Sequence, residues 1–367
     1  MVTVIKYLFR LGVIVLVSFS VCYTCAAERF GTSHSGIVPR PIIAPSANPS
    51  PIDAPTIALK NIVPLYSEPK MPGEGIWVKQ DMSEGHDQAA LIYRTFYRPS
   101  VRFPTAIVYM MLINMHHVSA KLYLGSSEPY KGDSPSSIEK SIQSQLVCVT
   151  NALWPTRHSG PGGIIFRGEV LKKMAPGVAT LVIYKNGKVD VIDWSDKIPV
   201  SEVQDARQLQ HLIAKDGKIV TTRVKRGRIV FAEIGLGSLL DEDRPVIAVP
   251  ASAPGEKPTY KLNFTSGDLW FLATRSAFGI RPDGNLVFAV GRHINTLDLA
   301  KALVLAGCVR AIHGDANPGN AVGILYFTDG NGKIVQKDRL APFQDKSTVN
   351  RYLQGSYPKD FVAFFRR

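Results

Sequence analysis

Four tight-turn dipeptides, each placed between two apolar runs, constrain the fold of this chain more than any other feature. They are Asn186-Gly187, Asp216-Gly217, Asp283-Gly284 and Asp329-Gly330. Asn-Gly and Asp-Gly pairs tolerate the positive φ angles of a tight hairpin turn, so the flanking runs are expected to be antiparallel strands. The sequence therefore predicts a protein rich in β-sheet.

Two further segments have the apolar spacing of helices. Residues 200–214 place Val203, Leu209, Leu212 and Ile213 on one helical face. Residues 296–308 place Leu299, Leu303 and Ala306 likewise, and Gly307 is the expected C-terminal stop. Strand and helix patterns alternate along the chain without a solenoid repeat. We therefore predict one domain over residues 61–367, of the α/β (mixed α+β) class, in which a mixed sheet with hairpins carries helices packed on it.

The first 60 residues have a different composition. Lys6 and Arg10 precede an uncharged stretch that ends in two alanines, so residues 1–27 are predicted to be a signal peptide or an uncleaved N-terminal anchor. Residues 28–60 are rich in proline and are predicted to be an extended linker. We expect a secreted, periplasmic or extracellular protein, with membrane association if the first segment is retained.

Charge and cysteine content leave two alternatives open. The formal net charge is +13, which favours anionic partners, and the densest basic stretch, residues 223–228, is either a solvated hairpin tip or a polyanion site. Cys148 and Cys308 are the cysteines that follow the N-terminal segment. They form a disulfide or remain two buried free thiols.

Several familiar motifs are missing from the sequence. The stretch from Gly235 has leucine where a dinucleotide fingerprint needs its third glycine, and the chain has no phosphate-binding loop ending in Gly-Lys-Ser/Thr. It also has neither a Gly-x-Ser-x-Gly elbow nor a His-Glu-x-x-His helix. We accordingly expect no cofactor and no metal.

Polar residues at the ends of predicted strands form the candidate site. Asn151 ends one apolar run, and a glycine-rich stretch leads from it to a new strand carrying Arg167. Arg275 lies between two apolar runs, where an arginine either pairs with a carboxylate or binds an anion. The octapeptide His-Gly-Asp-Ala-Asn-Pro-Gly-Asn at residues 313–320 follows another strand, and loops at strand ends commonly carry chemistry.

These segments, taken in order, resemble the phosphodiester glycosidase family, which includes N-acetylglucosamine-1-phosphodiester alpha-N-acetylglucosaminidase and bacterial exopolysaccharide-associated proteins. The matching positions are Arg275 to Ile280, Asp283-Gly284, Leu299-Ala300, Gly307, Ala311 and Asp315. The resemblance spans roughly residues 88 to 330 and is that of a divergent member. Where the family has Asp-Gly-Gly-Gly-Ser, this chain has Asp315 followed by Ala316, Asn317 and Pro318. Family residues carry over only to Asn151, Arg275, Gly279 and Asp315.

The resemblance implies a glycosidase-like hydrolase acting on a sugar phosphodiester or a cell-surface polysaccharide, with an anionic glycan or sugar phosphate as partner and no nucleic acid. Asp315 and His313 are the candidate catalytic residues, because hydrolysis at an anomeric carbon needs proton transfer from paired groups. Candidate substrate-binding residues are Asn151, Arg167, Arg275, Gly279 and Asn317. Arg275 would bind phosphate oxygens with its planar fork.

Three of these residues also have a simpler, purely structural interpretation. Asp315 could cap a turn, Arg275 could belong to a structural ion pair, and Asn151 could be an ordinary turn residue. The alternative function is a non-catalytic envelope protein that binds a glycan or another polyanion and has lost the glycine loop of the active site.

Overall fold

The structure is a computed structural model that describes residues 57–83, 90–129, 132, 134–154, 162–225, 228–234 and 272–367. The predicted signal or anchor segment and residues 28–56 of the predicted linker lie outside these ranges. Residues 57–60 of that linker are described and belong to no helix or strand. Within the described ranges, none of the helices has the length and apolar character that crossing a membrane requires.

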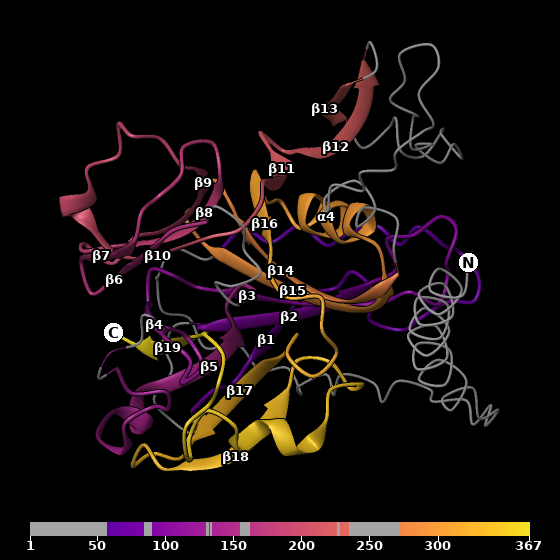
Figure 1. Cartoon of the computed structure of the whole chain (residues 1–367). Coiled ribbons are helices and arrows are strands. Elements are labelled where there is room, and N and C mark those ends of the chain that lie inside the picture. Colours follow the sequence, from indigo (N-terminus) through magenta and orange to yellow (C-terminus); the bar gives the residue numbers. More distant parts are fainter. Residues whose placement is uncertain are drawn as a thin grey trace, which may run out of the picture. The chain divides into compact units, whose positions relative to one another are not determined.

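The described part of the chain is essentially all-β, so the predicted α/β class is wrong. Three antiparallel sheets contain its strands, and one helix, α4 (Thr296–Leu305), is longer than six residues. The other described helices are short 3₁₀ segments: η1 (Lys140–Gln145), η3 (Val200–Glu202) and η4 (Lys346–Asn350). Figure 1 shows the sheets and the position of α4.

The first sheet has nine strands in the order β1-β2-β3-β15-β14-β16-β11-β12-β13. Their bounds are β1 Val78–Gln80, β2 Ile92–Tyr97, β3 Val108–Ile113, β11 Leu212–Lys215, β12 Lys218–Lys225, β13 Arg228–Ile234, β14 Ala273–Ile280, β15 Leu286–Ile294 and β16 Arg310–His313. The central strands β3, β14 and β15 are buried along almost their whole length.

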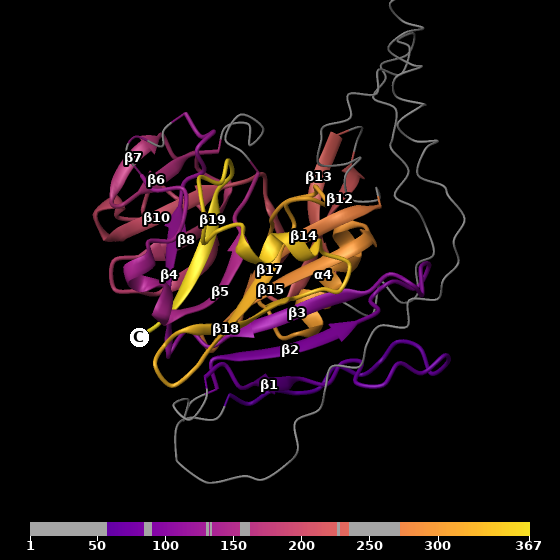
Figure 2. The ribbon, with the colours of Figure 1, turned by 90° about the horizontal axis from the view of Figure 1, so that it is seen from below.

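Two sheets of five strands complete the fold. The second sheet has the order β7-β6-β10-β8-β9, with β6 Ile164–Phe166, β7 Glu169–Lys172, β8 Ala179–Tyr184, β9 Val189–Asp193 and β10 Val203–Gln208. The third has the order β18-β17-β5-β19-β4, with β4 Val118–Tyr123, β5 Leu146–Asn151, β17 Gly323–Thr328, β18 Ile334–Arg339 and β19 Phe361–Arg366. Figure 2 shows the same sheets from below.

The four hairpins predicted from turn dipeptides are confirmed. The turns at residues 186–187, 216–217, 283–284 and 329–330 join β8 to β9, β11 to β12, β14 to β15 and β17 to β18, and each strand pair is antiparallel. Gly187 and Gly284 adopt positive φ angles of 83° and 79°, which a residue without Cβ accepts at no steric cost. Local turn chemistry therefore determines these connections.

The helix predicted over residues 296–308 is also confirmed. The Asn295 side chain caps α4 by accepting the Asp298 N–H at 2.7 Å, and Gly307 follows the helix with a φ of 87°. Its buried face packs on one side of the first sheet, together with residues of β11, β14 and β15.

The helix predicted over residues 200–214 is wrong, since this segment forms η3 and the strands β10 and β11. Nearly every residue of β10 is buried, including Arg207 and Gln208, so the period-two alternation of a half-exposed strand is hidden. Pairing with β6 and β8 determines its conformation. The apolar residues that suggested a helical face are divided between two strands.

The largest core cluster contains buried side chains from all three sheets, among them Phe278, Phe288, Val147, Phe364 and Leu181. The three sheets therefore share one apolar interior. At the margin of that interior, polar side chains from all three sheets meet.

Candidate functional site at the junction of the three sheets

Asn151, the last residue of β5, links the third sheet to the first. Its Nδ2 donates to the Ser276 Oγ at 2.9 Å and to the Ala152 carbonyl at 2.7 Å, and its Oδ1 accepts the Val322 N–H at 3.1 Å. The side chain is only 3% exposed. Asn151 is thus a fully engaged buried amide rather than an ordinary turn residue.

Ser276, in β14, connects this amide with the segment that carries Asp315. Its Oγ also accepts the Asp315 N–H at 2.9 Å, and its backbone N–H donates to the Asp315 carbonyl at 2.8 Å. Asn151 and Asp315, remote in the sequence, therefore bond the same hydroxyl. Sequence reasoning did not identify Ser276; the available signal was a small polar residue inside an apolar strand, next to Arg275.

Asp315 follows β16 at the boundary between the interior and an exposed loop. Its Oδ1 accepts the Asn317 N–H at 2.8 Å, so the side chain does cap a turn. The residue is 5% exposed, while residues 317–319 are exposed. Burial raises the pKa of the Asp315 carboxyl, and the hydrogen bond from Asn317 and the charge of Lys359 partly oppose this shift.

Arg275 and His313 lie side by side on β14 and β16. Arg275 is fully buried, donates from Nε to the Ile294 carbonyl at 3.1 Å, and has its Nη1 at 3.3 Å from the His313 Nε2. A guanidinium can only donate, so Nε2 accepts and the ring proton is assigned to Nδ1. Within the described part of the chain, the buried His313 Nδ1 has no hydrogen-bond partner.

The charge state of His313 follows from its surroundings. Burial, the positive charge of Arg275 and the nearby His211 all lower the pKa of His313 well below its usual value. The imidazole is therefore neutral at neutral pH, and its Nδ1–H is an unpaired donor inside the protein.

Trp154 lies beside this histidine, held by a buried ion pair. The Trp154 and His313 rings are T-shaped, with centroids 5.9 Å apart. Arg207 of β10 donates from Nη2 to the Trp154 carbonyl at 2.8 Å, and its Nε lies 2.6 Å from the Asp360 Oδ2. The Asp360 carbonyl accepts the Ala152 N–H at 3.1 Å, so the pair holds the segment after β5 at both ends.

We call this set of residues the junction cluster: Asn151, Trp154, Arg207, Arg275, Ser276, His313, Asp315 and Asp360. Burial raises the pKa of Asp360 to about 6 against the opposing charge of Arg207. Ion pair, amide and imidazole come from strand ends of all three sheets. Such a concentration of buried polar groups outside secondary-structure ladders is more typical of a functional site than of a core.

Two predicted site residues lie elsewhere. A Cβ on Gly279 would be 2.5 Å from the Cys308 Sγ, so this glycine allows close packing of β14 against the residues that follow α4. Arg167 is exposed in the turn between β6 and β7, with its guanidinium 5.0 Å above the Phe166 ring. No contact within the described ranges joins either residue to the junction cluster.

Both cysteines that follow the N-terminal segment lie within the described ranges. Cys148 and Cys308 are free, buried thiols, and burial raises the pKa of each. The described residues contain no cluster of three or more His, Cys, Asp or Glu side chains placed to hold a metal ion.

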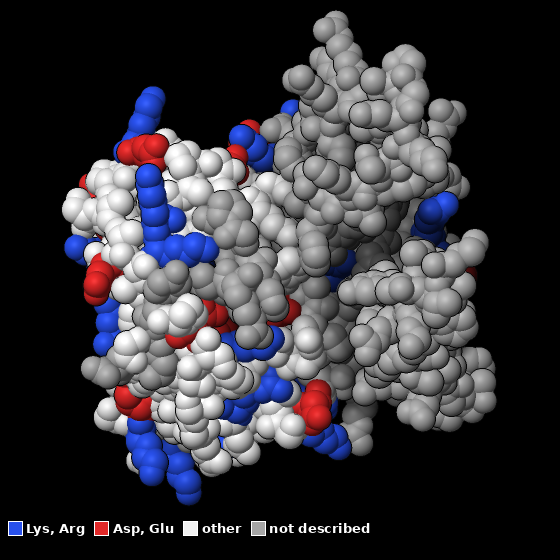
Figure 3. Space-filling view, in the orientation of Figure 1, with Lys and Arg blue, Asp and Glu red and all other residues white. Residues whose placement is uncertain are grey.

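Surface charge is mixed on the face seen in Figure 3. Lys and Arg side chains are spread over the described part of this face with Asp and Glu between them. The positive net charge therefore does not form one continuous basic patch on the described part of this face. The side chains of the basic stretch at residues 223–228 lie outside what the structure describes.

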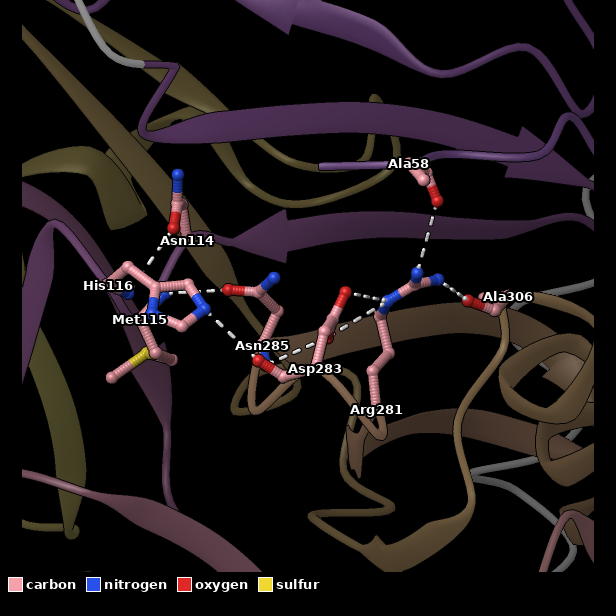
Figure 4. Close-up of polar contacts among 8 residues, drawn as sticks. All are labelled: Ala58, Asn114, Met115, His116, Arg281, Asp283, Asn285 and Ala306. Atoms are coloured by element: carbon pink, nitrogen blue, oxygen red, sulfur yellow. Dashed lines mark hydrogen bonds and ion pairs between the residues drawn. The ribbon is translucent and has the colours of Figure 1, made fainter. Parts of the chain in front are cut away.

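A separate pocket of about 360 Å³ is lined by residues outside the junction cluster, and Figure 4 shows polar contacts that involve five of its lining residues: Ala58, His116, Arg281, Asp283 and Asn285. Arg281 donates to the Ala306 carbonyl at 2.7 Å and to the Ala58 carbonyl at 3.4 Å, and it pairs with Asp283 at 3.1 Å. His116, in the turn after β3, contacts the Asp283 carbonyl at 3.1 Å. Arg281 thus fastens the segment at residue 58 to the end of α4.

Comparison with known proteins gives only distant likenesses. No protein-family model matches the chain, and no curated protein matches it. The catalytic domain of zebrafish N-acetylglucosamine-1-phosphodiester alpha-N-acetylglucosaminidase, auto-inhibited by its pro-peptide, is similar at a TM-score of 0.45 and 14% identity, over 79% of this chain and 88% of that one.

Two bacterial structures are similar at lower scores. A hypothetical protein from Synechocystis gives a TM-score of 0.34 at 11% identity, over 71% of this chain and 59% of that one. A protein from Burkholderia pseudomallei that is described as exported gives 0.36 at 12%, over 71% and 74%. Likenesses at this level do not define the activity of this chain.

Proposed function

We propose that this protein is a glycosidase-like hydrolase of sugar phosphodiesters, secreted or tethered to a membrane by its N-terminal segment. The observation that carries the proposal is the shared hydroxyl of Ser276, which bonds both Asn151 and Asp315 beside the buried pair of Arg275 and His313. The family resemblance of these same sequence segments supports it independently.

The charges of the junction cluster suit an anionic substrate. Arg275 and Arg207 place two guanidinium groups in the interior, where electrostatic attraction is screened less than at the surface. Arg275 is fully buried and already bonded, so in this proposal it acts mainly through its field and by fixing His313. Direct contact between Arg275 and phosphate oxygens stays a prediction.

Asp315 is proposed as the general acid. Its raised pKa favours a carboxyl that keeps its proton longer than a surface aspartate does, and the buried residue lies two positions before the exposed residues 317–319. Water attacks the anomeric carbon and the bond from that carbon to the phosphate oxygen breaks. The bonding electrons stay on that oxygen, which takes the proton of Asp315, and the attacking water loses a proton to solvent.

His313 is proposed as a neutral hydrogen-bond donor rather than a base. The lone pair of its Nε2 faces the Arg275 donor, and its pKa is lowered, so the ring is poorly suited to accept a proton. Its Nδ1–H remains able to bond an oxygen of the substrate. Asn317 bonds the Asp315 carboxyl through its backbone and is proposed to shape the exposed rim.

A non-catalytic binding protein is the second candidate, and two observations favour it. Ala316 and Pro318 replace glycines in the loop after Asp315, which narrows the approach to the main chain. One carboxylate oxygen of Asp315 is also already engaged in a hydrogen bond to the backbone of a turn. In this case the junction cluster would hold a sugar phosphate without cleaving it.

The test measures reducing sugar released from the methyl phosphodiester of glucose 1-phosphate, with wild type and the Asp315→Asn variant. We expect the substitution to lower turnover by roughly 10²- to 10⁴-fold, the usual contribution of a general acid. Wild-type activity should fall as the pH rises through the raised pKa of Asp315, because the acid loses its proton there.

Asp345→Asn is the matched control. The Asp345 Oδ1 accepts the Ser347 N–H at 2.8 Å, the same i to i+2 hydrogen bond as at Asp315, and Asp345 is the N-cap residue before η4. This variant should keep wild-type turnover. Full activity of Asp315→Asn would refute the acid role, and binding of the diester without any wild-type turnover would favour the binding protein.

A further inference from the structure

We infer that Trp154 and His313 form a subsite for a pyranose ring, in which the indole stacks on the sugar and the His313 Nδ1–H donates to a sugar oxygen. This inference deepens the proposed function and rests on it. It assigns the recognition of the uncharged part of the ligand to two residues of the junction cluster that carry no charge.

The first observation is the unpaired donor of His313. The ring is 1% exposed, its Nε2 is engaged by Arg275, and its Nδ1 has no hydrogen-bond partner in the described part of the chain. Leaving a buried N–H unbonded costs stability, so native proteins rarely do so without a functional reason. An oxygen of a bound ligand would satisfy this donor.

The second observation is the placement of Trp154. The indole packs partly against the main core and is partly exposed, and it meets the His313 ring in a T-shaped arrangement with an interplanar angle of 78°. The Trp154 carbonyl is held by Arg207 at 2.8 Å, and Ala152 is held by Asp360 at 3.1 Å. An aromatic ring whose backbone is fixed in this way is preorganised for binding.

The two groups together match the chemistry of a sugar ring. A pyranose has an apolar face of C–H groups and oxygens around its edge, so it can use an aromatic face and a nearby N–H donor at once. A free phosphate has oxygens but no apolar face. Trp154 and His313 would therefore contribute little to the binding of phosphate. The charged residues of the junction cluster would bind the phosphate group.

The experiment compares two ligands of similar charge by isothermal titration calorimetry: glucose 1-phosphate, which has the ring, and glycerol 1-phosphate, which lacks it. Wild type, Trp154→Ala and Trp154→Phe are measured. We expect Trp154→Ala to raise the Kd of glucose 1-phosphate by about 3- to 10-fold, with Trp154→Phe in between, because an aromatic contact of this kind contributes that much.

The Kd of glycerol 1-phosphate should be the same in all three proteins. Trp77→Ala is the matched control, since Trp77 is a partly buried tryptophan that packs against the other side of the first sheet. It should leave both affinities unchanged. His313→Phe removes the donor and keeps an aromatic ring, and it should weaken glucose 1-phosphate selectively.

Three results would overturn the inference: equal losses for both ligands in Trp154→Ala, no change with glucose 1-phosphate, or no wild-type binding of either ligand. The hydrolase proposal fails separately. Binding that depends on the sugar ring, without turnover, would support the subsite and refute the hydrolase proposal. Turnover with an unchanged Kd of glucose 1-phosphate in the Trp154 variants would support the hydrolase proposal and refute the subsite.

Discussion

Two buried arginine–carboxylate pairs in this fold have similar burial and very different geometry. Arg98 and Glu74 form bonds of 2.9 Å and 2.6 Å between guanidinium and carboxylate, and the Arg98 N–H adds a third bond at 2.9 Å. Arg207 and Asp360 make one close contact, 2.6 Å from Nε to Oδ2, and within the described part of the chain the buried Arg207 Nη1 has no hydrogen-bond partner.

The difference in hydrogen bonding separates a purely structural ion pair from one that retains an unsatisfied polar atom. Glu74 and Arg98 satisfy each other where the segment before β1 meets the end of β2. Arg207 keeps an unsatisfied Nη1 beside Trp154 and the other residues of the junction cluster. Buried polar atoms without a hydrogen bond are found at sites where a bound ligand supplies the missing partner. In a purely structural ion pair, both side chains normally have all their hydrogen bonds within the protein.

The largest expected effect on stability comes from breaking the complete pair. Glu74→Gln should lower the free energy of unfolding by roughly 3–5 kcal/mol, because it leaves the buried Arg98 charge uncompensated. Urea denaturation followed by circular dichroism measures the change. A loss no greater than that of Asp360→Asn would contradict the distinction between the pairs.

Asp360→Asn also leaves a buried guanidinium without its counter-charge, and it should cost less, about 1–3 kcal/mol at neutral pH, because burial already opposes ionisation of the Asp360 carboxyl by raising its pKa. The Asn side chain can still accept the Gly125 N–H, which bonds Asp360 at 2.9 Å. The same urea measurement, run in parallel with Glu74→Gln, ranks the two substitutions.

The stability difference between wild type and Asp360→Asn should depend on pH, and this dependence tests the ionisation state of the Arg207–Asp360 pair. Burial raises the pKa of Asp360 to about 6, so between about pH 4 and 6 the unfolded chain is ionised there while the folded chain keeps the proton. Wild-type stability relative to Asp360→Asn should therefore fall as the pH rises through this window and level off above it. A relative stability that rises with pH across this window would show that the pair is fully ionised when folded.

Ser276→Ala should lower stability by about 1–2 kcal/mol, since the Asn151 amide and the Asp315 N–H both lose their acceptor. Turnover should fall with it, because the position of Asp315 is no longer fixed. Ser119→Ala is the control: Ser119 lies in β4 and donates to the Phe365 carbonyl at 3.4 Å, outside the junction cluster. An equal loss of turnover in both variants would remove the special role of Ser276.

The smallest effect is expected at an exposed pair. Lys79 and Asp81 are 4.0 Å apart with side chains 42% and 71% exposed, so Asp81→Asn should change the free energy of unfolding by less than about 1 kcal/mol. The urea series that includes Glu74→Gln provides this value. A change as large as that at a buried pair would mean that burial does not control the ranking.

Local signals predicted the parts of the fold whose contacts are local. Turn dipeptides such as Asn186-Gly187 and the Asn295 cap each act within a few residues, and the corresponding hairpins and α4 form as expected. Strand β10 depends instead on partners 19 to 43 residues away and is buried on both faces, so its sequence showed no alternation. The α/β expectation failed with this segment.

The candidate site was only partly accessible from sequence. Asn151 and Asp315 share the Ser276 hydroxyl, and the neighbouring Arg275 contacts His313, although the roles of these residues stay predictions. Arg207 and Asp360 could not be assigned, because their meeting depends on how the second and third sheets pack. No sequence signal marked Arg207, because it lies in a largely polar stretch between Asp205 and Gln208.

Nuclear magnetic resonance of the His313 ring nitrogens tests the central claim most directly. If the junction cluster is an unfilled sugar-phosphate site, His313 should be a neutral imidazole with the proton on Nδ1 at about pH 6.5, where an ordinary histidine is half protonated, and its Nδ1–H signal should shift when glucose 1-phosphate is added. A histidine that titrates near pH 6.5, or a signal unmoved at saturating ligand, would contradict it.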